Sequence, residues 1–249
     1  MTLPSVEAFE RAGLRAWPGI EVEWDRAWVR RAANGYTKRA NSLQCFDPAD
    51  SAEAGTRLAQ AVAWFDQCGL PAVVRTTPLE SPALTAALDA ANWQITDRSH
   101  LYAMPLRAHR ADPGGHILSL SDPVFIAAQQ NLQHYDPART RKLQALLASM
   151  AVPACGVVVE REGAIVATGL MAIADGIVVA GNVITDPARR RQGLGAAMMQ
   201  TGLAWAFDNG ATIAALNVQA DNAAGKALYA SLGYTHQYDY SYRFPGEPN

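Results

Sequence analysis

The hexapeptide Arg190-Arg191-Gln192-Gly193-Leu194-Gly195 lies between a strand-like apolar run, Ile177–Thr185, and a helix-like segment that ends near Asn209. At such a strand–loop–helix junction the first backbone N–H groups of the helix have no intrahelical partner, and the helix dipole is positive there. Both features favour a bound diphosphate. Gly193 and Gly195 would let the backbone approach phosphate oxygens, and the arginines would add charged hydrogen bonds. The hexapeptide therefore predicts an anion site where a strand leads into a helix.

The two most familiar phosphate loops do not fit this sequence. A dinucleotide-binding loop requires glycine or alanine at the position of Met198, and an acidic residue at the end of a second strand, which is missing at the expected distance. A Walker A loop requires Gly-Lys followed by Ser or Thr, and the sequence lacks this run. A glycine-containing turn with solvated arginines remains as the alternative without a ligand.

A second segment downstream narrows the choice of ligand for the predicted anion site. Its sequence NAAGKALYASLGY (Asn222–Tyr234) resembles the N-x-x-A-x-x-L-Y-x-x-x-G-[FY] element of the GNAT superfamily of N-acetyltransferases. Motif A of that superfamily, [QR]-x-x-G-x-[GA], is matched by Arg190-x-x-Gly193-x-Gly195. Gly225 departs from the pattern, because alanine is usual at that position. The two motifs occur in the family's order, so the chain resembles a GNAT enzyme.

The resemblance covers about Leu118–Phe244 and implies a fold, a co-substrate and a set of residues. The implied fold is α/β (α+β), with a mixed, mostly antiparallel sheet flanked by helices. The implied reaction transfers the acetyl group of acetyl-CoA to a primary amine of a small molecule or a protein, without a metal. The implied CoA-binding residues are Val183, Ile184, Thr185, Arg190, Arg191, Gln192, Gly193, Leu194, Gly195, Ala196 and Asn222.

Each of these residues has an implied role. Val183–Thr185 would bond the pantetheine arm through their backbone, and Arg191–Ala196 would hold the pyrophosphate through backbone N–H groups. Asn222 would contact the CoA arm through its side chain. Tyr229 would lie near the sulfur and protonate the departing thiolate, which a phenol with a pKa of about 10 can do.

Other parts of the mechanism stay open at this stage. A non-catalytic acyl-CoA sensor is one alternative, although Tyr229 favours an enzyme, and a transferase of a longer acyl group is another. The sequence does not identify a general base; the candidates by chemistry alone are Glu160, Asp175, Asp186, His134 and His236.

The sequence also predicts an internal duplication. At an offset of 141 positions, Trp64 and Gly69 fall on Trp205 and Gly210, and Leu88 falls on Tyr229. We therefore predict a degenerate GNAT-like segment at residues 1–107, a linker at 108–116 and a catalytic segment at 117–249. The final strand, His236–Phe244, could pair across the two segments to give a continuous sheet with pseudo-twofold symmetry.

The first copy lacks the predicted chemistry. Where the second copy has the hexapeptide, the first has Ala49–Ala54, with no glycine and two acidic residues that would repel a pyrophosphate. The first copy also contains one polar cluster, Gly35–Ser42. This cluster could line the acceptor pocket between the two segments, or it could be a solvated hairpin.

Composition excludes several classes of protein. The chain has 249 residues, a hydrophobic fraction of 49% and a net charge of −2, which disfavour intrinsic disorder and general nucleic-acid binding. It contains no apolar run of transmembrane length and no signal peptide at its start. The three cysteines form no metal-ligand pattern. We expect a cytoplasmic enzyme without nucleic-acid or membrane partners, either a monomer that mimics a dimer or a homodimer.

Overall fold

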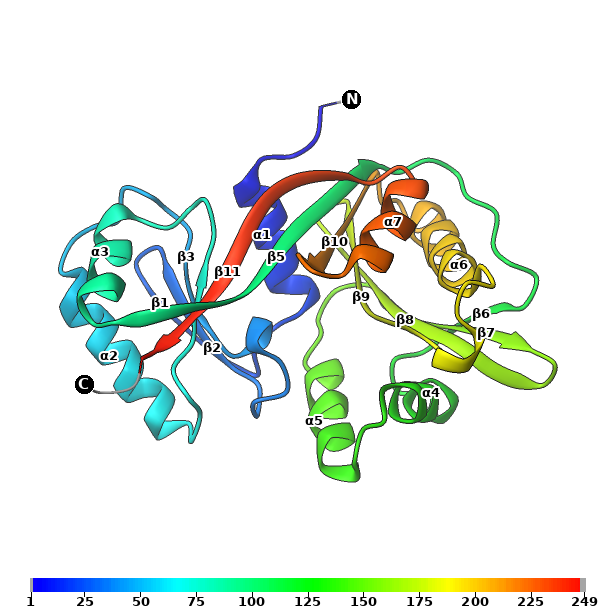
Figure 1. Cartoon of the computed structure of the whole chain (residues 1–249), viewed down its shortest axis with the longest axis horizontal. Coiled ribbons are helices and arrows are strands. Elements are labelled where there is room, and N and C mark those ends of the chain that lie inside the picture. Colours follow the sequence, from blue (N-terminus) through cyan, green and yellow to red (C-terminus); the bar gives the residue numbers. More distant parts are fainter. Residues whose placement is uncertain (1, 247–249) are drawn as a thin grey trace.

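The computed structural model describes residues 2–246, and its strands form one sheet across the whole length of the molecule (Figure 1). The order of the strands in this sheet is β1-β2-β3-β4-β11-β5-β10-β9-β8-β7-β6. The strands are β1 Glu21–Asp25, β2 Trp28–Ala32, β3 Leu43–Cys45, β4 Val74–Thr76, β5 Trp93–Pro105, β6 Gly115–Leu118, β7 Ala154–Arg161, β8 Ala164–Ala174, β9 Ile177–Thr185, β10 Ile213–Gln219 and β11 Thr235–Pro245.

The sheet is mixed and mostly antiparallel, as the sequence predicts. Only β3/β4 and β9/β10 pair in parallel among the described strands. The helices are α1 Val6–Ala16, α2 Ala54–Gln67, α3 Pro82–Ala90, α4 Pro123–Gln133, α5 Pro137–Ala148, α6 Leu194–Asp208 and α7 Ala223–Ser231, with short 3₁₀ turns η1 at Lys38–Ala40 and η2 at Pro187–Arg189.

Local sequence sets where several helices begin. The side chains of Ser81 and Asp136 accept hydrogen bonds from the first-turn N–H groups of α3 and α5. A proline follows each of these capping residues, at a helix position that does not need an N–H donor. Capping serine or aspartate followed by proline is thus a start signal that the sequence alone carries.

Two long strands exchange places at the centre of the sheet. β5, which follows α3, pairs with β10, whereas β11, which follows α7, pairs with β4. β5 and β11 also pair with each other, and Figure 1 shows them side by side across the middle of the molecule. Each end of the sheet is therefore completed by a strand from the other end of the chain.

The geometry repeats at the offset that the sequence repeats. Both ends of α7 lie 141 positions after the corresponding ends of α3, and Ser99 pairs with Tyr240, which lies 141 positions after it. Gly69 and Gly210 both follow a helix with positive φ, of 66° and 85°. The division into segments 1–107, 108–116 and 117–249 nevertheless stays a prediction. Residues 1 and 247–249, at the outer ends of these segments, lie outside the described part of the chain.

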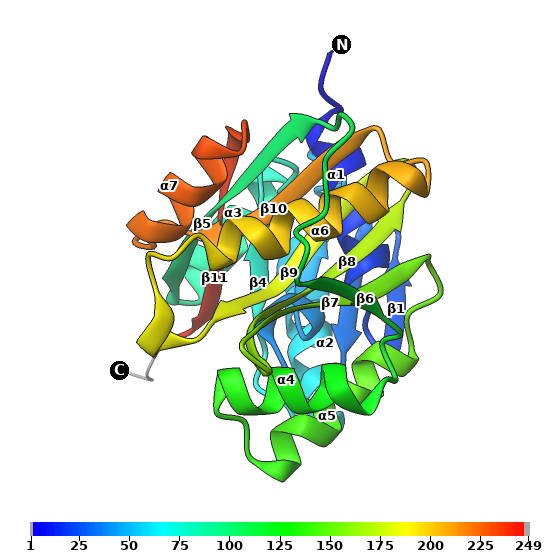
Figure 2. The same cartoon turned by 90° about the vertical axis from the view of Figure 1, so that its right-hand side faces the viewer.

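Helices cover both faces of the sheet (Figure 2). α6 and α7 lie on one face, and α1, α4 and α5 lie on the other. Two glycines, one in β7 and one in β8, show how closely the helices approach the sheet. A Cβ on Gly169 would lie 2.7 Å from Met198 Sδ of α6, and a Cβ on Gly156 would lie 2.4 Å from the ring of Phe125 in α4. Glycine at these strand positions lets the helices pack tightly on the sheet.

The structure corrects two predicted strands. The sequence predicts a strand at Arg39–Phe46, but residues 38–40 form η1 and only Leu43–Cys45 pair in the sheet. It also predicts a strand at His100–Met104, but this strand begins at Trp93, because its polar first half pairs with β11. Hydrophobic periodicity does not detect the polar half of β5, because this half is stabilised by pairing with another strand and not by burial of an apolar face.

No helix among residues 2–246 combines the length and the apolar character needed to cross a membrane.

The strand exchange predicts that the two predicted segments do not fold alone. A chain of residues 108–249 lacks β4 and β5, so β10 loses its partner on one edge and β11 loses its partners on both edges. We expect it to show no cooperative thermal transition, whereas a full-length protein cleaved within residues 108–114 keeps its circular-dichroism spectrum and its transition. Cooperative unfolding of the isolated 108–249 chain at the melting temperature of the full-length protein would contradict the role of the exchange.

Candidate active site

Strands β9 and β10 separate in the middle of the sheet. Their parallel pairing runs from Ile177↔Ile213 to Ala180↔Leu216 and then ends, although both strands continue. Beyond this point Gly181–Thr185 retains a partner only in β8. The backbone edge of β9 that faces β10 is therefore free over Val183, Ile184 and Thr185, where the sequence places pantetheine contacts. The contact itself stays a prediction.

A β-bulge lies at the start of this free edge. Pairing with β8 shifts by one residue between Thr168↔Ile184 and Leu170↔Gly181, and Asn182 has a φ of 50°. Side chains from two distant parts of the chain hold the bulge: Gln129 Nε2 donates to the Asn182 carbonyl at 3.2 Å, and Asn182 Nδ2 donates to the Tyr36 hydroxyl at 2.9 Å. Sequence reasoning missed Asn182, although a Gly-Asn pair inside an apolar strand is a bulge signal.

The hexapeptide forms the turn that leads into α6. Asp186 caps η2 through the Ala188 N–H, and Arg189 pairs with Glu162 at 3.2 Å. Arg190 and Arg191 are exposed and form no ion pair with any described residue. Their guanidinium groups are therefore available to a ligand at this turn.

The start of α6 has no side-chain cap. The N-cap residue is Gly193, whose φ of 75° favours glycine, and no side chain accepts a hydrogen bond from the first turn. The N–H groups of Leu194, Gly195 and Ala196 are consequently free at the positive end of the helix dipole, as the sequence predicts.

The two glycines of the hexapeptide act differently. A Cβ on Gly193 would meet nothing within 4 Å, so this residue is required by its backbone conformation and leaves space above the turn. A Cβ on Gly195 would lie 2.9 Å from Leu228 Cδ2 of α7. The missing side chain at Gly195 therefore lets α7 approach α6, and the phosphate contact of this residue stays a prediction.

Asn222 caps α7. Its Oδ1 accepts a hydrogen bond from the Gly225 N–H at 2.8 Å, and its amide nitrogen forms no hydrogen bond with described residues. A Cβ on residue 225 would lie 2.7 Å from that nitrogen, so the glycine lets the Asn222 amide lie close to the first turn of α7. The predicted CoA contact can therefore use only the Nδ2 donor without disturbing the helix cap.

Tyr229 is buried on α7 and belongs to the hydrophobic cluster that also contains Leu194 and Leu216. Its ring packs edge-on against Tyr234, with centroids 6.0 Å apart. Burial raises the pKa of the Tyr229 phenol to about 12, and no described residue accepts a hydrogen bond from its hydroxyl. The phenol is thus protonated at neutral pH and free to donate.

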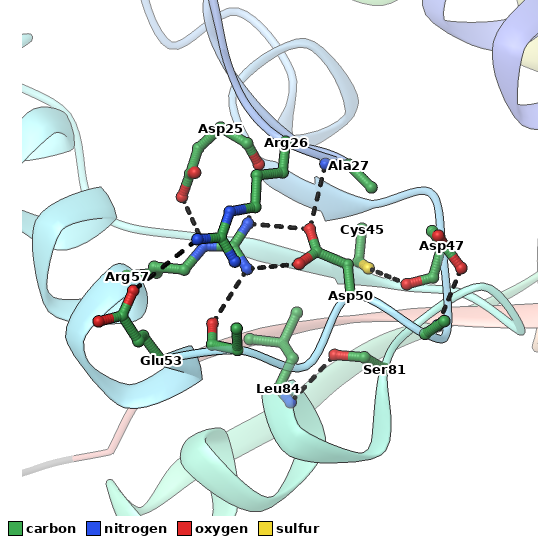
Figure 3. Close-up of polar contacts among 12 residues, drawn as sticks. Asp25, Arg26, Ala27, Cys45, Asp47, Asp50, Glu53, Arg57, Ser81 and Leu84 are labelled. Carbon is green, nitrogen blue, oxygen red and sulfur yellow. Dashed lines mark hydrogen bonds and ion pairs between the residues drawn. The ribbon is translucent and has the colours of Figure 1, made fainter.

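At the start of α2, where the first copy would hold its phosphates, the protein's own side chains fill the space (Figure 3). Asp50 accepts from Arg57 Nη1 at 2.9 Å and from the Ala27 N–H at 3.1 Å, and Arg57 also binds Asp25. Hydrogen bonding from Arg57 holds the pKa of Asp50 below its usual value. Glu53 occupies the N-cap position with a φ of 54°, which Gly193 occupies in α6. A carboxylate and its arginine thus stand where a phosphate would bind.

The polar cluster Gly35–Ser42 is not a solvated hairpin. Tyr36 is 2% exposed, and its hydroxyl lies between Asn182 of β9 and Tyr135. Asn41 is also buried, but it holds its own loop by accepting from the Ala33 N–H at 2.6 Å. The segment therefore places Tyr36 against the bulge at Asn182. Asn41 instead stabilises the conformation of its own loop.

The general-base candidates do not converge on the bulge. Asp175 pairs with Arg15 at 2.5 Å in an exposed turn, and Asp186 caps η2. Glu160, His134 and His236 are exposed.

One group of side chains in residues 2–246 has the spacing of metal ligands. The ligand atoms of His100, His236 and Asp239 all lie within 4.8 Å of one another. Asp239 is hydrogen-bonded to both histidine rings at 2.6 Å, and these bonds hold its pKa below the usual value. The three groups satisfy one another in an exposed position, so their geometry does not require an ion.

Comparison with known proteins identifies the family. Residues 4–243 match the family described as "Probable histone acetyltransferase Rv0428c C-terminal". The chain belongs to this family of GNAT-type acetyltransferases. The uncharacterised N-acetyltransferase YobR of Bacillus subtilis (strain 168) is 23% identical over 97% of this chain and 99% of its own length.

Solved structures share the fold of this acetyltransferase. A GCN5-related N-acetyltransferase from Kribbella flavida matches with a TM-score of 0.73 and 22% identity, over 98% of this chain and 97% of its own. A tandem GNAT protein from the clavulanic acid biosynthesis pathway matches with a TM-score of 0.61 and 12% identity, over 84% of this chain and 76% of its own. GNAT acetyltransferases use acetyl-CoA as acyl donor.

The filled site at α2 predicts a stability effect without a binding effect. Asp50→Asn removes one of the two charged partners of the buried Arg57 and should lower the free energy of unfolding by about 2 kcal/mol, measured by urea denaturation at pH 7. Because the pKa of Asp50 is depressed in the folded protein, this difference should persist above about pH 4 and disappear as the pH falls further.

The matched control is Asp175→Asn, which breaks an exposed pair and should cost less than about 1 kcal/mol. Both variants should bind acetyl-CoA as the unaltered protein does. Weakened binding in Asp50→Asn alone would place a cofactor site at α2 after all.

Proposed function

We propose that this acetyltransferase moves the acetyl group of acetyl-CoA to a primary amine of a small molecule or a protein. The observation that carries the proposal is the free edge of β9 at Gly181–Thr185, which runs directly into the uncapped start of α6. One face of a single segment thus offers hydrogen bonds for an extended arm and then for a diphosphate, in the order in which CoA carries them.

The proposed binding mode assigns each predicted contact to a group that the structure leaves free. Val183–Thr185 bond the pantetheine amides through the unpaired edge of β9. The N–H groups of Leu194–Ala196 and the guanidinium groups of Arg190 and Arg191 bind the pyrophosphate. Asn222 Nδ2 donates to the arm from the start of α7.

The proposed chemistry is direct transfer without an acyl-enzyme intermediate. The neutral amine attacks the thioester carbonyl and forms a C–N bond and a tetrahedral oxyanion, which an N–H group at the Asn182 bulge stabilises. The nitrogen of the attacking amine loses its proton to solvent, the C–S bond breaks, and the thiolate receives the phenolic proton of Tyr229, whose phenolate then regains a proton from solvent. Burial raises the pKa of Tyr229 to about 12, so the phenol carries that proton at neutral pH.

The first segment of the chain supplies a wall rather than a second active site. Asp50 and Arg57 fill its phosphate position, and the residue that corresponds to Tyr229 is the buried Leu88. The repeated geometry of α3 and α7, together with the likeness to a tandem GNAT protein, supports two GNAT-like segments with one site between them. Such a chain is a monomer that mimics a dimer.

Two alternatives use the same site. A non-catalytic sensor would bind acyl-CoA without turnover, and a transferase of a longer acyl group would need more room beyond the thioester. The free hydroxyl of Tyr229 favours catalysis, because a sensor would not need a proton donor at the sulfur.

Substitutions at Gly193 test the phosphate site. Gly193→Val cannot adopt a φ of 75° without strain, and it should lower acetyl-CoA affinity more than tenfold by closing the turn. Gly193→Asn is the matched control, since asparagine tolerates this conformation and should keep most of the affinity. Calorimetric titration gives both values, and equal affinities in the two variants would refute the site.

Tyr229→Phe tests the proton donor. It removes one hydroxyl that has no protein partner, so the protein should fold normally and bind acetyl-CoA with unchanged affinity. Its turnover number should fall by about 100-fold, as loss of a general acid predicts. Thiol release with an amine panel measures turnover; unchanged turnover would remove Tyr229 from the mechanism, and a chain without turnover in either form would be the sensor.

A further inference from the structure

A charged cluster is buried beside α1, formed by Glu10 of α1 and by side chains of β2, β3 and β4. Glu10, Gln44 and Arg75 are each less than 5% exposed. The Glu10 carboxylate accepts from Arg75 Nη2 at 2.8 Å, from Gln44 Nε2 at 2.7 Å and from the Tyr238 hydroxyl at 2.7 Å. Although burial alone would raise it, the charge of Arg75 and these hydrogen bonds bring the pKa of Glu10 below its usual value. Glu10, which supplies the single carboxylate of the cluster, is therefore already bound by Arg75, Gln44 and Tyr238.

Two further guanidinium groups of the cluster have no carboxylate partner. Arg31 is 1% exposed; it donates only to the Trp17 carbonyl at 3.3 Å and to Gln44 at 3.5 Å, and its Nε has no partner. Arg39 stacks on the Trp17 ring at 4.8 Å. Neither forms an ion pair with any described acidic residue. Burial, together with the nearby charge of Arg75, lowers the pKa of Arg31 to about 10, so the group is still cationic at neutral pH.

A small cavity lies between these groups and the strands of the candidate active site. Arg31 and Arg39 line it together with the ion pair of Glu10 and Arg75, and with Val179 of β9 and Asn217 of β10. Asn217 is the first residue of β10 beyond its last pair with β9, and its buried Oδ1 also lacks a hydrogen-bond partner. Arg39 lies beside the bulge, because a Cβ on Gly181 would be 3.5 Å from its Nη2.

The cavity lies on the α1 face of the sheet, and Tyr229 and α6 lie on the opposite face. If the thioester of acetyl-CoA lies between β9 and β10, the CoA arm would thus extend from one face of the sheet. The acceptor amine would reach the thioester carbonyl from the other face. Unpaired charge on the acceptor side costs folding free energy, since a buried cation without a counter-ion is unfavourable. A ligand that brings a negative charge removes this cost.

We infer that the acceptor is an amino carboxylate, whose carboxylate binds Arg31 and Arg39 while its amine faces the bulge at Asn182. This inference rests on the proposed acetyl transfer. A carboxylate matches the planar guanidinium fork and supplies the acceptor that Arg31 Nε lacks. The cavity has room for about a water-sized group, which fits one end of such a ligand better than a phosphate. A strongly basic acceptor would meet two uncompensated cations.

Matched amines test the inference. Phenylalanine is compared with phenethylamine, and lysine with cadaverine, so that each pair differs by one carboxylate; O-phosphoethanolamine against β-alanine distinguishes a phosphate from a carboxylate. Thiol release from acetyl-CoA gives kcat/KM. The carboxylate-bearing member should be preferred by about 10- to 100-fold, the range for a charged hydrogen bond.

Variants of Arg39 assign the preference to the cavity. Arg39→Gln should lower kcat/KM for the amino carboxylate by about tenfold or more, mainly through KM, and should leave the decarboxylated amine within about twofold. Arg39→Lys should restore part of the loss. Arg11→Gln is the control, because it removes an equal charge from the exposed face of α1, where Arg11 pairs with Glu7 and lies over the Phe46 ring, outside the cavity.

Four results would overturn the inference. Decarboxylated amines that are turned over equally well would exclude the carboxylate, and a preference for O-phosphoethanolamine would reassign the anion to a phosphate. An equal loss for both members of a pair in Arg39→Gln would make Arg39 structural. Thermal stabilisation by acetyl-CoA without turnover of any amino carboxylate would exclude this acceptor class. Failure of acetyl-CoA itself to stabilise the protein would instead reject the proposed function.

Discussion

The separation of β9 from β10 after the pair Ala180↔Leu216 is the constraint on which the rest of the structure depends. A sheet interior normally pairs every backbone group, so an unpaired edge at its centre must be held open and must be satisfied by something else. The bulge at Asn182 bends β9 away, and Gln129 and Tyr36 fix the bulge from two different parts of the chain. The acyl donor proposed for this gap would complete the hydrogen bonds that the second strand no longer makes.

The exchange of β5 and β11 ties the first part of the chain to the candidate site. It completes the sheet to which β9 and β10 belong, and Arg31 and Arg39 line a cavity together with Val179 of β9. At the start of α2, Asp50 and Arg57 form a hydrogen-bonded ion pair at the place that corresponds to the start of α6. In the proposed function the first copy therefore acts as a wall of the one site.

Local sequence patterns predicted most elements of this fold. The elements that depend on pairing between distant segments were not predicted correctly. Periodicity located β9 at its observed bounds and the end of α6 within one residue, because those signals lie inside each element. The polar half of β5 and the short β3 were missed, since their pairing partners lie far away in the sequence. In the site, motif positions predicted the free groups of Val183–Thr185 and Leu194–Ala196. The Asn182 bulge and the unpaired Arg31 became visible only when distant segments came together.

Hydrogen exchange of backbone amides with and without acetyl-CoA tests the central claim most directly. Binding should slow exchange at two places, the free edge Gly181–Thr185 and the first turn of α6 at Leu194–Ala196, because these N–H groups gain acceptors only from the ligand. The start of α2, at Ala54–Arg57, should exchange at the same rate in both states. Protection at the start of α2, or none along β9, would contradict a single acetyl-CoA site in the gap between β9 and β10.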